Sequence, residues 1–473
     1  MKILFIIPPF SSGGGWLVPH IGIAYMAAVL KQKGYDVTIA DAIAERLSGP
    51  GIVDSIKKVK PDIVGLTATT QQIYTASIIA NEVKGISPEI KTIIGGCHVS
   101  PLPEQTLREF SSFDYAVIGE GELVLPELLR AISDGNDGAL VNIKGIAYRT
   151  DDKVVVNPQG SYVDVNSLPM PDFDGFDLSL YRPFYTLPIH GYRELPILTS
   201  RGCPYDCVFC FRTKGKIARY RTVQSVINEV KRDIETYHAN QISFIDDTFT
   251  TNMKRTEMIC DELMKAGIHK KIEWSCGTRA DVVSGPLLSK MKQAGCRVIS
   301  YGIESGDQKI LDKATKGLKI EEIREAIRLT KHAGIDVYAN FIIGLPYDTV
   351  DSINKTIDFA MGLDIDAASF AILTPFPGTG LIDMIKNGSG GLKMISSDWR
   401  DYHKHLGRSL ELDAVDRKKL EKLQRKAYMK FYLRPKRFIN MFKIVGLGTI
   451  MSYALQRVYI KKSGPSRIND HSV

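Results

Sequence analysis

The sequence predicts an α/β protein: an N-terminal doubly wound (Rossmann-like) parallel sheet, then a partial (β/α)6 TIM barrel, then a helical, basic C-terminal tail. Two stretches predict the sheets, because in each of them short β-branched runs, apolar on both faces, alternate with helix-period segments. Accumulated Lys and Arg near the end predict the tail. We place the doubly wound domain at 1–140, a hairpin and linker at 141–190, the barrel at 191–400 and the helical basic region at 401–473.

The first domain is expected to have its ligand-binding edge where its strands end. Strands are predicted at 2–7, 36–41, 62–69, 91–96 and 114–118, with helices at 21–34, 72–84 and 122–132 among the connections. The strand ends read "LTATT", "IIGGCH" and "VIGEGE", and such sheets bind ligands at the carboxyl ends of their strands. The first strand is not followed by Gly-x-Gly-x-x-Gly, so a nicotinamide dinucleotide is not expected.

A hairpin and a linker join the two alternating stretches. Residues 143–158 predict a β-hairpin that turns at 151–152, and the Pro- and Asp-rich segment 164–190 predicts an ordered connector with little regular structure. Six strands are then expected at 195–200, 241–247, 272–280, 297–305, 336–346 and 367–377. Helices are expected at 223–238, 254–266, 286–294, 320–332 and 350–361. In barrels of this kind chemistry sits at the carboxyl ends of the strands.

The stretch "TSRGCPYDCVFCFR", residues 199–212, follows the first of these six strands and carries Cys203, Cys207 and Cys210. A structural zinc site usually takes four ligands from two separated pairs, and a disulfide framework needs an even number, so three cysteines suit neither well. Soft thiolates select iron–sulfur clusters, copper(I) or zinc. A four-iron cluster held by three cysteines keeps one iron free to bind a cofactor; zinc binding or plain packing is the alternative. Gly202 permits a sharp approach to the loop, and Phe209 can shield a cluster from water.

"CPYDCVFC" resembles the signature of the radical S-adenosylmethionine (SAM) superfamily. The resemblance implies that a [4Fe–4S] cluster binds SAM through its free iron and cleaves it to a 5′-deoxyadenosyl radical. It also implies contacts to SAM from later strand ends: carboxylates for the amine, an Arg for the carboxylate, an acid for the ribose and a glycine beside the adenine. The residues at these places are Asp246, Asp247, Arg279, Glu304, Ser305 and Gly344. The alternative role for an Asp after a strand is to cap the next helix.

The other four cysteines do not form a second cluster motif. Cys260 is expected mid-helix, and packing is the expected role of all four. For Cys276, on the third predicted strand, the alternative is a position that faces the barrel interior.

A doubly wound domain before a radical SAM barrel resembles the cobalamin-binding class of that superfamily. The resemblance covers about residues 1–400 and implies corrin contacts at the Gly- and Thr-rich strand ends. The candidate residues are Thr67, Thr69, Gly95, Gly96, His98, Gly119, Glu120 and Gly121. The motif Asp-x-His-x-x-Gly, whose His ligates cobalt in many cobalamin proteins, is absent. We therefore expect cobalt without a His ligand from this domain, and His98 to be more often a hydrogen-bonding residue than a ligand. A corrin-free Rossmann-like domain is the alternative.

Charge and hydropathy constrain partners and compartment. The whole chain carries +8, but residues 415–462 hold fourteen Lys or Arg against two acids, so the rest sums to −4. The tail could cap the barrel, lie on an anionic membrane surface or deliver a lipid-like substrate. Nucleic acid is not favoured, because no RNA-binding module is recognisable. No apolar run reaches the roughly 18 residues that a membrane-spanning helix needs. The N-terminus does not resemble a signal peptide, so we expect a cytoplasmic protein, peripheral to the membrane if the tail binds one.

These features together predict a cobalamin-dependent radical SAM enzyme that acts on an unactivated carbon of a small-molecule, lipid-like or tetrapyrrole substrate. Methyl transfer and oxidative cyclisation, as in the anaerobic porphyrin ring cyclases, both remain open, and an electron donor such as flavodoxin or ferredoxin is expected. A tRNA-modifying methylthiotransferase would need three further cysteines in its N-terminal domain, which here has Cys97 alone. A non-catalytic cobalamin or redox sensor is the other alternative.

Overall fold

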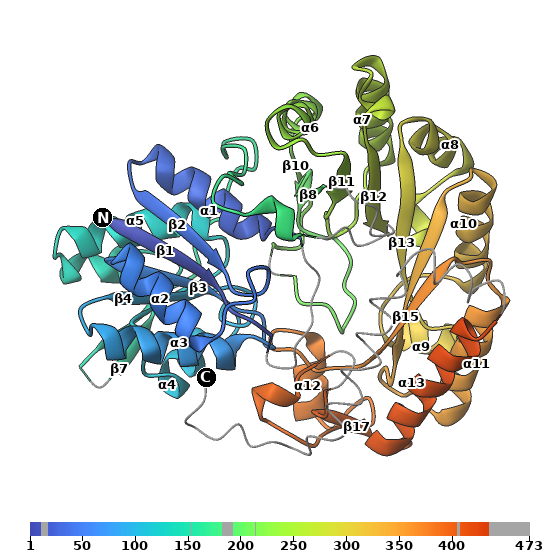
Figure 1. Ribbon diagram of the computed structural model, residues 1–473. Helices are drawn as coiled ribbons and strands as arrows, with labels where there is room; N and C mark the ends of the chain where they lie inside the picture. Colours follow the sequence, from blue (N-terminus) through green and yellow to red (C-terminus); the bar gives the residue numbers. More distant parts are fainter. Residues whose placement is uncertain (11–17, 152, 182–192, 213, 404–406, 435–473) are drawn as a thin grey trace.

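The computed structural model describes residues 1–10, 18–151, 153–181, 193–212, 214–403 and 407–434. Two sheets stand side by side in Figure 1, the first drawn in blue and teal and the second in green to orange. Both consist mainly of parallel strands joined by helices, which confirms the predicted α/β class. The predicted strands and helices of both stretches are present, with ends shifted by a few residues.

The first sheet has seven strands in the order β2-β1-β3-β4-β5-β6-β7. Five are parallel: β1 (Lys2–Ile7), β2 (Asp36–Asp41), β3 (Ile63–Thr67), β4 (Lys91–Gly95) and β5 (Tyr115–Val117). The hairpin β6 (Ile146–Thr150) and β7 (Lys153–Val156) continues the sheet in antiparallel fashion. Residue 140, where we expected the first domain to end, is therefore followed by two more strands of the same sheet.

Helices cover both faces of this sheet: α1 (Ile21–Gln32), α2 (Gly49–Val59), α3 (Ile73–Ile86), α4 (Pro103–Glu109) and α5 (Gly121–Ser133). The pleat of β1 explains how. Ile3 and Phe5 belong to the core formed with α1 and α5, whereas Leu4 and Ile6 belong to the core formed with α2, α3 and α4. Because successive side chains of a strand point to opposite faces, an uninterrupted apolar run requires this double cover.

The second sheet has six parallel strands in the order β15-β14-β13-β12-β11-β8, and within the described residues β8 and β15 are its edges. The strands are β8 (Glu194–Ile197), β11 (Gln241–Phe244), β12 (Glu273–Thr278), β13 (Cys296–Glu304), β14 (Asp336–Ile343) and β15 (Ala367–Ile372). The helices are α6 (Val223–Tyr237), α7 (Met253–Lys265), α8 (Gly285–Gln293), α9 (Gln308–Lys313), α10 (Ile320–His332) and α11 (Val350–Gly362).

The C-terminal part packs on the second sheet. It contains α12 (Gly380–Lys386), β16 (Leu392–Met394), β17 (Leu410–Leu412) and α13 (Arg417–Tyr432). Helix α13 lies against β15, where Gln424 donates to the Phe370 carbonyl and the Tyr432 hydroxyl donates to the Ala368 carbonyl. The start of the basic tail thus packs on the second sheet, as expected under the alternative in which the tail is a cap; residues 435–473 lie outside the described part.

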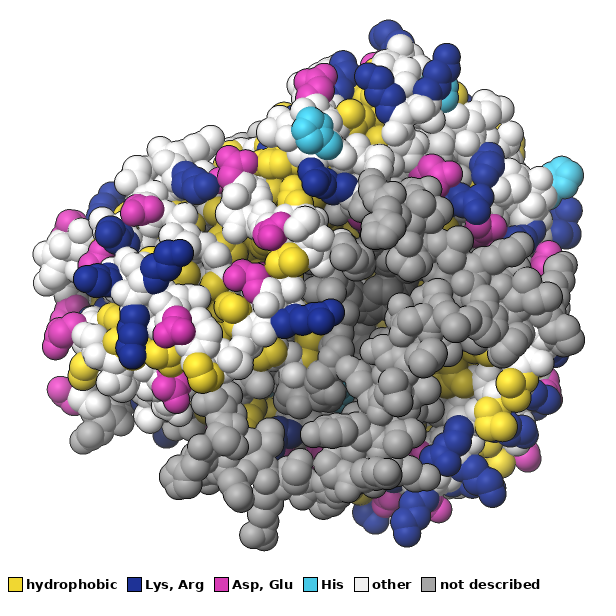
Figure 2. All heavy atoms as spheres, viewed as in Figure 1, with side chains coloured by type: hydrophobic (Ala, Val, Ile, Leu, Met, Phe, Trp, Pro, Cys, Tyr) yellow, Lys and Arg dark blue, Asp and Glu magenta, His cyan; other side chains and the backbone are white. Residues whose placement is uncertain are grey.

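Surface charge and helix length bear on the expected partners. On the face drawn in Figure 2, the basic and acidic side chains of the described residues are interspersed. In the described part of the chain, no helix is both long enough and apolar enough to cross a membrane.

Candidate functional site

The three-cysteine segment forms a loop closed at its base by a short ribbon. Strand β9 (Ser200–Arg201) pairs antiparallel with β10 (Arg219–Tyr220), so that Arg201 lies opposite Arg219. We call residues 202–218 between them the cysteine loop. Gly202 has φ +96°, and a Cβ there would lie 2.3 Å from the Ile217 carbonyl oxygen. Only glycine fits, because that neighbour is backbone and a side chain rarely adopts this conformation.

The three thiols of the cysteine loop affect one another. All are free, and Cys207 is buried. Burial raises the pKa of Cys207 and Cys210, the latter to about 11, and the negative charge of the neighbouring thiolates adds to both shifts. Such crowded thiols favour a cationic centre that they can share, and soft sulfur donors are those that an iron–sulfur cluster takes. The donor set therefore fits a cluster. Among the described residues, no group of three or more His, Cys, Asp or Glu side chains is placed to hold a single metal ion.

Two cations flank the cysteine loop. The Arg279 guanidinium lies 3.7 Å from the Tyr205 ring centroid, and its Nη1 is 4.0 Å from Cys207 Sγ. Asp281 accepts two hydrogen bonds of 2.9 Å from Arg279, which hold the guanidinium in place. Lys316 lies 5.8 Å from the ring centroid of Phe209. Arg279 was predicted from its strand end, whereas Lys316 was missed because it lies in a turn, "KATKG", with no motif to mark it.

Glu304, at the end of β13, also faces this region. It is buried, has φ +68° and accepts a 3.1 Å hydrogen bond from Lys316. A non-glycine residue held in the left-handed region stores strain, and such strain clusters at functional sites. The register of β13 against β14 shifts at this point, which turns the carboxylate toward Lys316.

The two acidic residues after β11 have different environments. Asp247 is exposed at the base of the cysteine loop, where it accepts a 3.2 Å hydrogen bond from the Gly202 amide. Asp246 is buried, and both its oxygens already accept hydrogen bonds from Thr199 or Ser200. The Asp246 carboxylate therefore braces the end of β8, and its expected contact with the SAM amine stays a prediction.

Two further expected SAM contacts are also occupied by structural interactions. The Ser305 hydroxyl is buried and lies 3.0 Å from that of Thr356. Gly344 has φ +87°, and a Cβ there would meet Leu412 and Leu420 at 3.2 Å. The space into which a side chain at Gly344 would point is therefore filled by the C-terminal part, and the expected approach of its backbone to an adenine stays a prediction.

A cavity of about 320 Å³ opens at the carboxyl edge of the first sheet. It extends inward between the sheet and helices α1 and α5, past Phe5, Gly65 and Leu129. A Cβ on Gly65 would lie 2.6 Å from the Phe5 ring, so a glycine here preserves the space. Six of the eight residues predicted to contact cobalamin line it: Thr67, Gly95, Gly96, Gly119, Glu120 and Gly121. A glycine-lined edge with an apolar groove behind it fits a corrin and its nucleotide tail.

The other two predicted contacts lie outside the cavity lining. The Thr69 hydroxyl donates to the Gln72 side chain. His98 is buried, lies 3.2 Å from the Thr70 hydroxyl and packs edge-on against Trp399 at 4.7 Å between centroids. Burial lowers the pKa of His98 to about 4, so the ring is neutral. His98 thus packs between the first domain and the C-terminal part, and its expected contact with cobalamin stays a prediction.

The cavity is completed by the second sheet. Leu198 and Arg201 beside β8, Lys214 of the cysteine loop and Ile245 after β11 all line it. The cavity and the cysteine loop therefore meet at Lys214, with Arg201 of β9 beside it. Arg201 and Lys214 were missed from the sequence, although both lie within four residues of a signature cysteine. Cys97 also lines the cavity, while the remaining cysteines, 260, 276 and 296, are buried in the core as expected.

Comparisons with known proteins agree with this arrangement. A B12 binding domain profile matches residues 15–129, and a radical SAM superfamily profile matches residues 197–360. An uncharacterised methyltransferase of Pyrococcus horikoshii is 36% identical over 93% of this chain and 94% of its own length. The anaerobic magnesium-protoporphyrin IX monomethyl ester cyclase of Rubrivivax gelatinosus is 31% identical over 92% of this chain and 78% of its own.

Among solved structures, the cobalamin-dependent SAM radical enzyme OxsB, with aqua-cobalamin and SAM bound, has a similar fold. Its TM-score is 0.75 at 18% identity, over 98% of this chain and 71% of that one. The methyltransferase TsrM of Kitasatospora setae, with cobalamin and a [4Fe–4S] cluster bound, has a TM-score of 0.71 at 18% identity, over 91% of this chain and 88% of that one.

Proposed function

Because the chain belongs to the cobalamin-binding class of the radical SAM superfamily, we propose that it transfers a methyl group to an unactivated carbon of a tetrapyrrole or lipid-like substrate. The class to which it belongs comprises enzymes of the methyltransferase and cyclase type, whose cofactors are a [4Fe–4S] cluster, SAM and cobalamin. When bound, these groups supply a 5′-deoxyadenosyl radical for hydrogen abstraction and a cobalt-borne methyl group. The observation that carries the proposal is that Lys214 of the cysteine loop and Arg201 at its base line the glycine-lined cavity.

The residues of the cysteine loop and those of the cavity would bind different cofactors. Cys203, Cys207 and Cys210 would hold the cluster, and Phe209 would shield it. Arg279 would pair with the SAM carboxylate from its place beside Cys207, and Glu304 with Lys316 would orient the rest of SAM. In this proposal the glycines of the first domain receive the corrin face, and Lys214 stands between cavity and cluster.

The finer architecture follows the same reasoning. We take the first sheet, to which the hairpin belongs, as a Rossmann-like doubly wound domain, and the second as a six-stranded partial barrel reaching about residue 400. A cytoplasmic site of action and a flavodoxin or ferredoxin as electron donor accord with this class of chemistry. We also propose contact of the tail with an anionic membrane surface, and the positive charge of the tail is its only support.

Methyl transfer is preferred to cyclisation because of the Pyrococcus horikoshii methyltransferase, which matches nearly the whole chain. Cyclisation is the second candidate, and the similarity to the Rubrivivax gelatinosus cyclase favours it; that relative also suggests the tetrapyrrole class.

The test is anaerobic reconstitution with iron, sulfide and cobalamin, followed by reduction in the presence of methyl-deuterated SAM and a panel of tetrapyrrole and lipid-like substrates. Formation of S-adenosylhomocysteine, 5′-deoxyadenosine and a product three mass units heavier than its unlabelled counterpart supports methyl transfer. Substrate-dependent 5′-deoxyadenosine without label transfer points to cyclisation. If no 5′-deoxyadenosine is formed, the protein is a sensor and the proposal fails. Cys207→Ala is the control that should form none.

A further inference from the structure

Glu120 at the end of β5 has a position that the predicted cobalamin contact does not explain. It lines the cavity, yet both its carboxylate oxygens are already occupied. Oε1 accepts from Arg201 at 3.3 Å and from Arg219 at 2.7 Å, while Oε2 accepts from Arg219 at 2.9 Å and from the Val163 amide at 2.8 Å. Four accepted hydrogen bonds use the capacity of a carboxylate, so none is left for a corrin amide.

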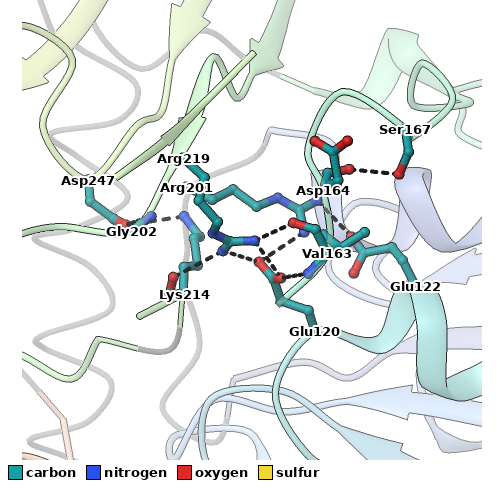
Figure 3. A network of polar contacts seen from close by, with 10 residues as sticks. All are labelled: Glu120, Glu122, Val163, Asp164, Ser167, Arg201, Gly202, Lys214, Arg219 and Asp247. Carbon is teal, nitrogen blue, oxygen red and sulfur yellow. Dashed lines mark hydrogen bonds and ion pairs between the residues drawn. The ribbon is translucent and has the colours of Figure 1, made fainter. Parts of the chain in front are cut away.

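The two arginines come from the strands that close the cysteine loop. Arg201 and Arg219 face each other in the β9–β10 ribbon, and Figure 3 shows both side chains directed at the Glu120 carboxylate. Arg201 also donates to Glu122 of α5 at 2.6 Å and lies over the ring of Tyr25 in α1, 5.0 Å from its centroid. The first domain thus contacts the base of the cysteine loop through α1, α5 and the turn that joins β5 to α5.

These contacts extend from the base into the cysteine loop itself. Arg219 donates to the Lys214 carbonyl at 3.0 Å, and the Lys214 ammonium lies 3.4 Å from Asp247. Asp247 in turn accepts from the Gly202 amide. Figure 3 shows this run of contacts from Glu120 to the end of β11. Any displacement of Glu120 would therefore be passed to backbone on both sides of the three cysteines.

The centre of the network, Glu120 with Arg201, is buried and charged. The side chains of Glu120 and Arg201 are each 7% exposed. Burial by itself would raise the pKa of Glu120, but the hydrogen bond from Arg219 and the charge of Arg201 lower the pKa below its usual value, so the carboxylate stays ionised. Buried pairs of this kind are weakly screened and specify geometry, because either partner alone would be an uncompensated charge.

We propose that Glu120 is a positioning residue: through Arg201 and Arg219 it fixes the cysteine loop against the rim of the cavity and so sets the separation between cobalt and the cluster. The inference rests on the proposed function, since only a reaction that uses both cofactors needs that separation. A misplacement of about 1 Å can cost a reaction about a hundredfold. Loosening the network should therefore uncouple SAM cleavage from product formation without emptying either site.

The experiment compares wild type with Glu120→Gln, which keeps size but removes charge. Its matched control is Glu104→Gln, an acid of the same domain in an exposed i,i+4 pair with Arg108. Iron and cobalamin contents are measured first. Pulsed EPR then measures the dipolar coupling between cob(II)alamin and the reduced cluster, and turnover assays give the ratio of product to 5′-deoxyadenosine.

For Glu120→Gln we expect both cofactors to be retained, a weaker or broadened coupling, and a product ratio lowered about 10- to 100-fold; Glu104→Gln should match wild type. A wild-type coupling and ratio in Glu120→Gln would overturn the proposal. So would loss of cobalamin with the cluster intact, which would make Glu120 a corrin contact. If Glu120→Gln does not fold, Arg219→Lys serves instead, because it keeps the charge but loses the bidentate hydrogen bonds to Glu120. It must then show the same lowered ratio of product to 5′-deoxyadenosine. Failure of the wild type to cleave SAM would instead refute the proposed function.

Discussion

Gly202→Ala should prevent cluster binding while leaving cobalamin binding intact. Placing a side chain at φ +96° costs about 1–2 kcal/mol. The new Cβ would also lie 2.3 Å from the Ile217 carbonyl oxygen and 3.0 Å from that of Lys214, and relieving such overpacking costs about 1–3 kcal/mol more. The sum of about 2–5 kcal/mol lowers the population of the closed cysteine loop about 30-fold to a few thousandfold, at about 1.4 kcal/mol per factor of ten.

Gly267→Ala is the matched control, since Gly267 has φ +69° with nothing within 4 Å of an added Cβ. It shares the backbone strain without the clash, so it should lose about 1–2 kcal/mol of stability and bind a full cluster. The assay is iron and sulfide content with the cluster absorbance after anaerobic reconstitution, beside cobalamin content. A Gly202→Ala protein that takes up iron with wild-type stoichiometry and affinity would refute the argument that glycine closes this loop.

Three further outcomes are expected. Replacing any of the three signature cysteines with Ala should abolish cluster binding and leave cobalamin content unchanged; loss of both together would mean that the two sites are not independent. Gly65→Val, which forces the Phe5 ring into the cavity, should weaken cobalamin binding at least about tenfold with the cluster retained, measured by corrin retention on gel filtration; undiminished retention would mean that the groove does not take the nucleotide tail. Burial raises the pKa of Asp233 from 3.8 to about 7, so between about pH 4 and 7 the folded state holds a proton that the unfolded state has lost, and stability falls as the pH rises through that window. Asp233→Asn should flatten this part of the melting-temperature profile between pH 5 and 8, and an unchanged slope would contradict the assignment.

Local patterns account for what could be predicted. The strands of both sheets are short apolar runs. Consecutive apolar residues, as in β1, indicate that both faces of the strand are buried. The spacing of the three cysteines likewise lies within eight positions, so the sequence alone points to a thiolate site. The predicted glycines of the first domain lie at the cavity for the same reason, since strand ends of a parallel sheet share one edge.

The contacts that could not be predicted are those that surround a strand end. Asp246, Ser305 and His98 lie where the pattern placed them, but neighbours far along the chain occupy their side chains. Residue type and strand position cannot reveal that Thr199 binds Asp246, or that Trp399 covers His98.

The sequence by itself determined the two α/β units, the thiolate trio and the glycine-rich edge, because each arises from residues close together in the chain. Only the tertiary structure decided that these units meet at the cavity and that Glu120 binds Arg201 and Arg219, which are 81 and 99 positions away. The physical reason is that a buried ion pair depends on how the two sheets pack against each other. Local sequence periodicity carries no information about that packing.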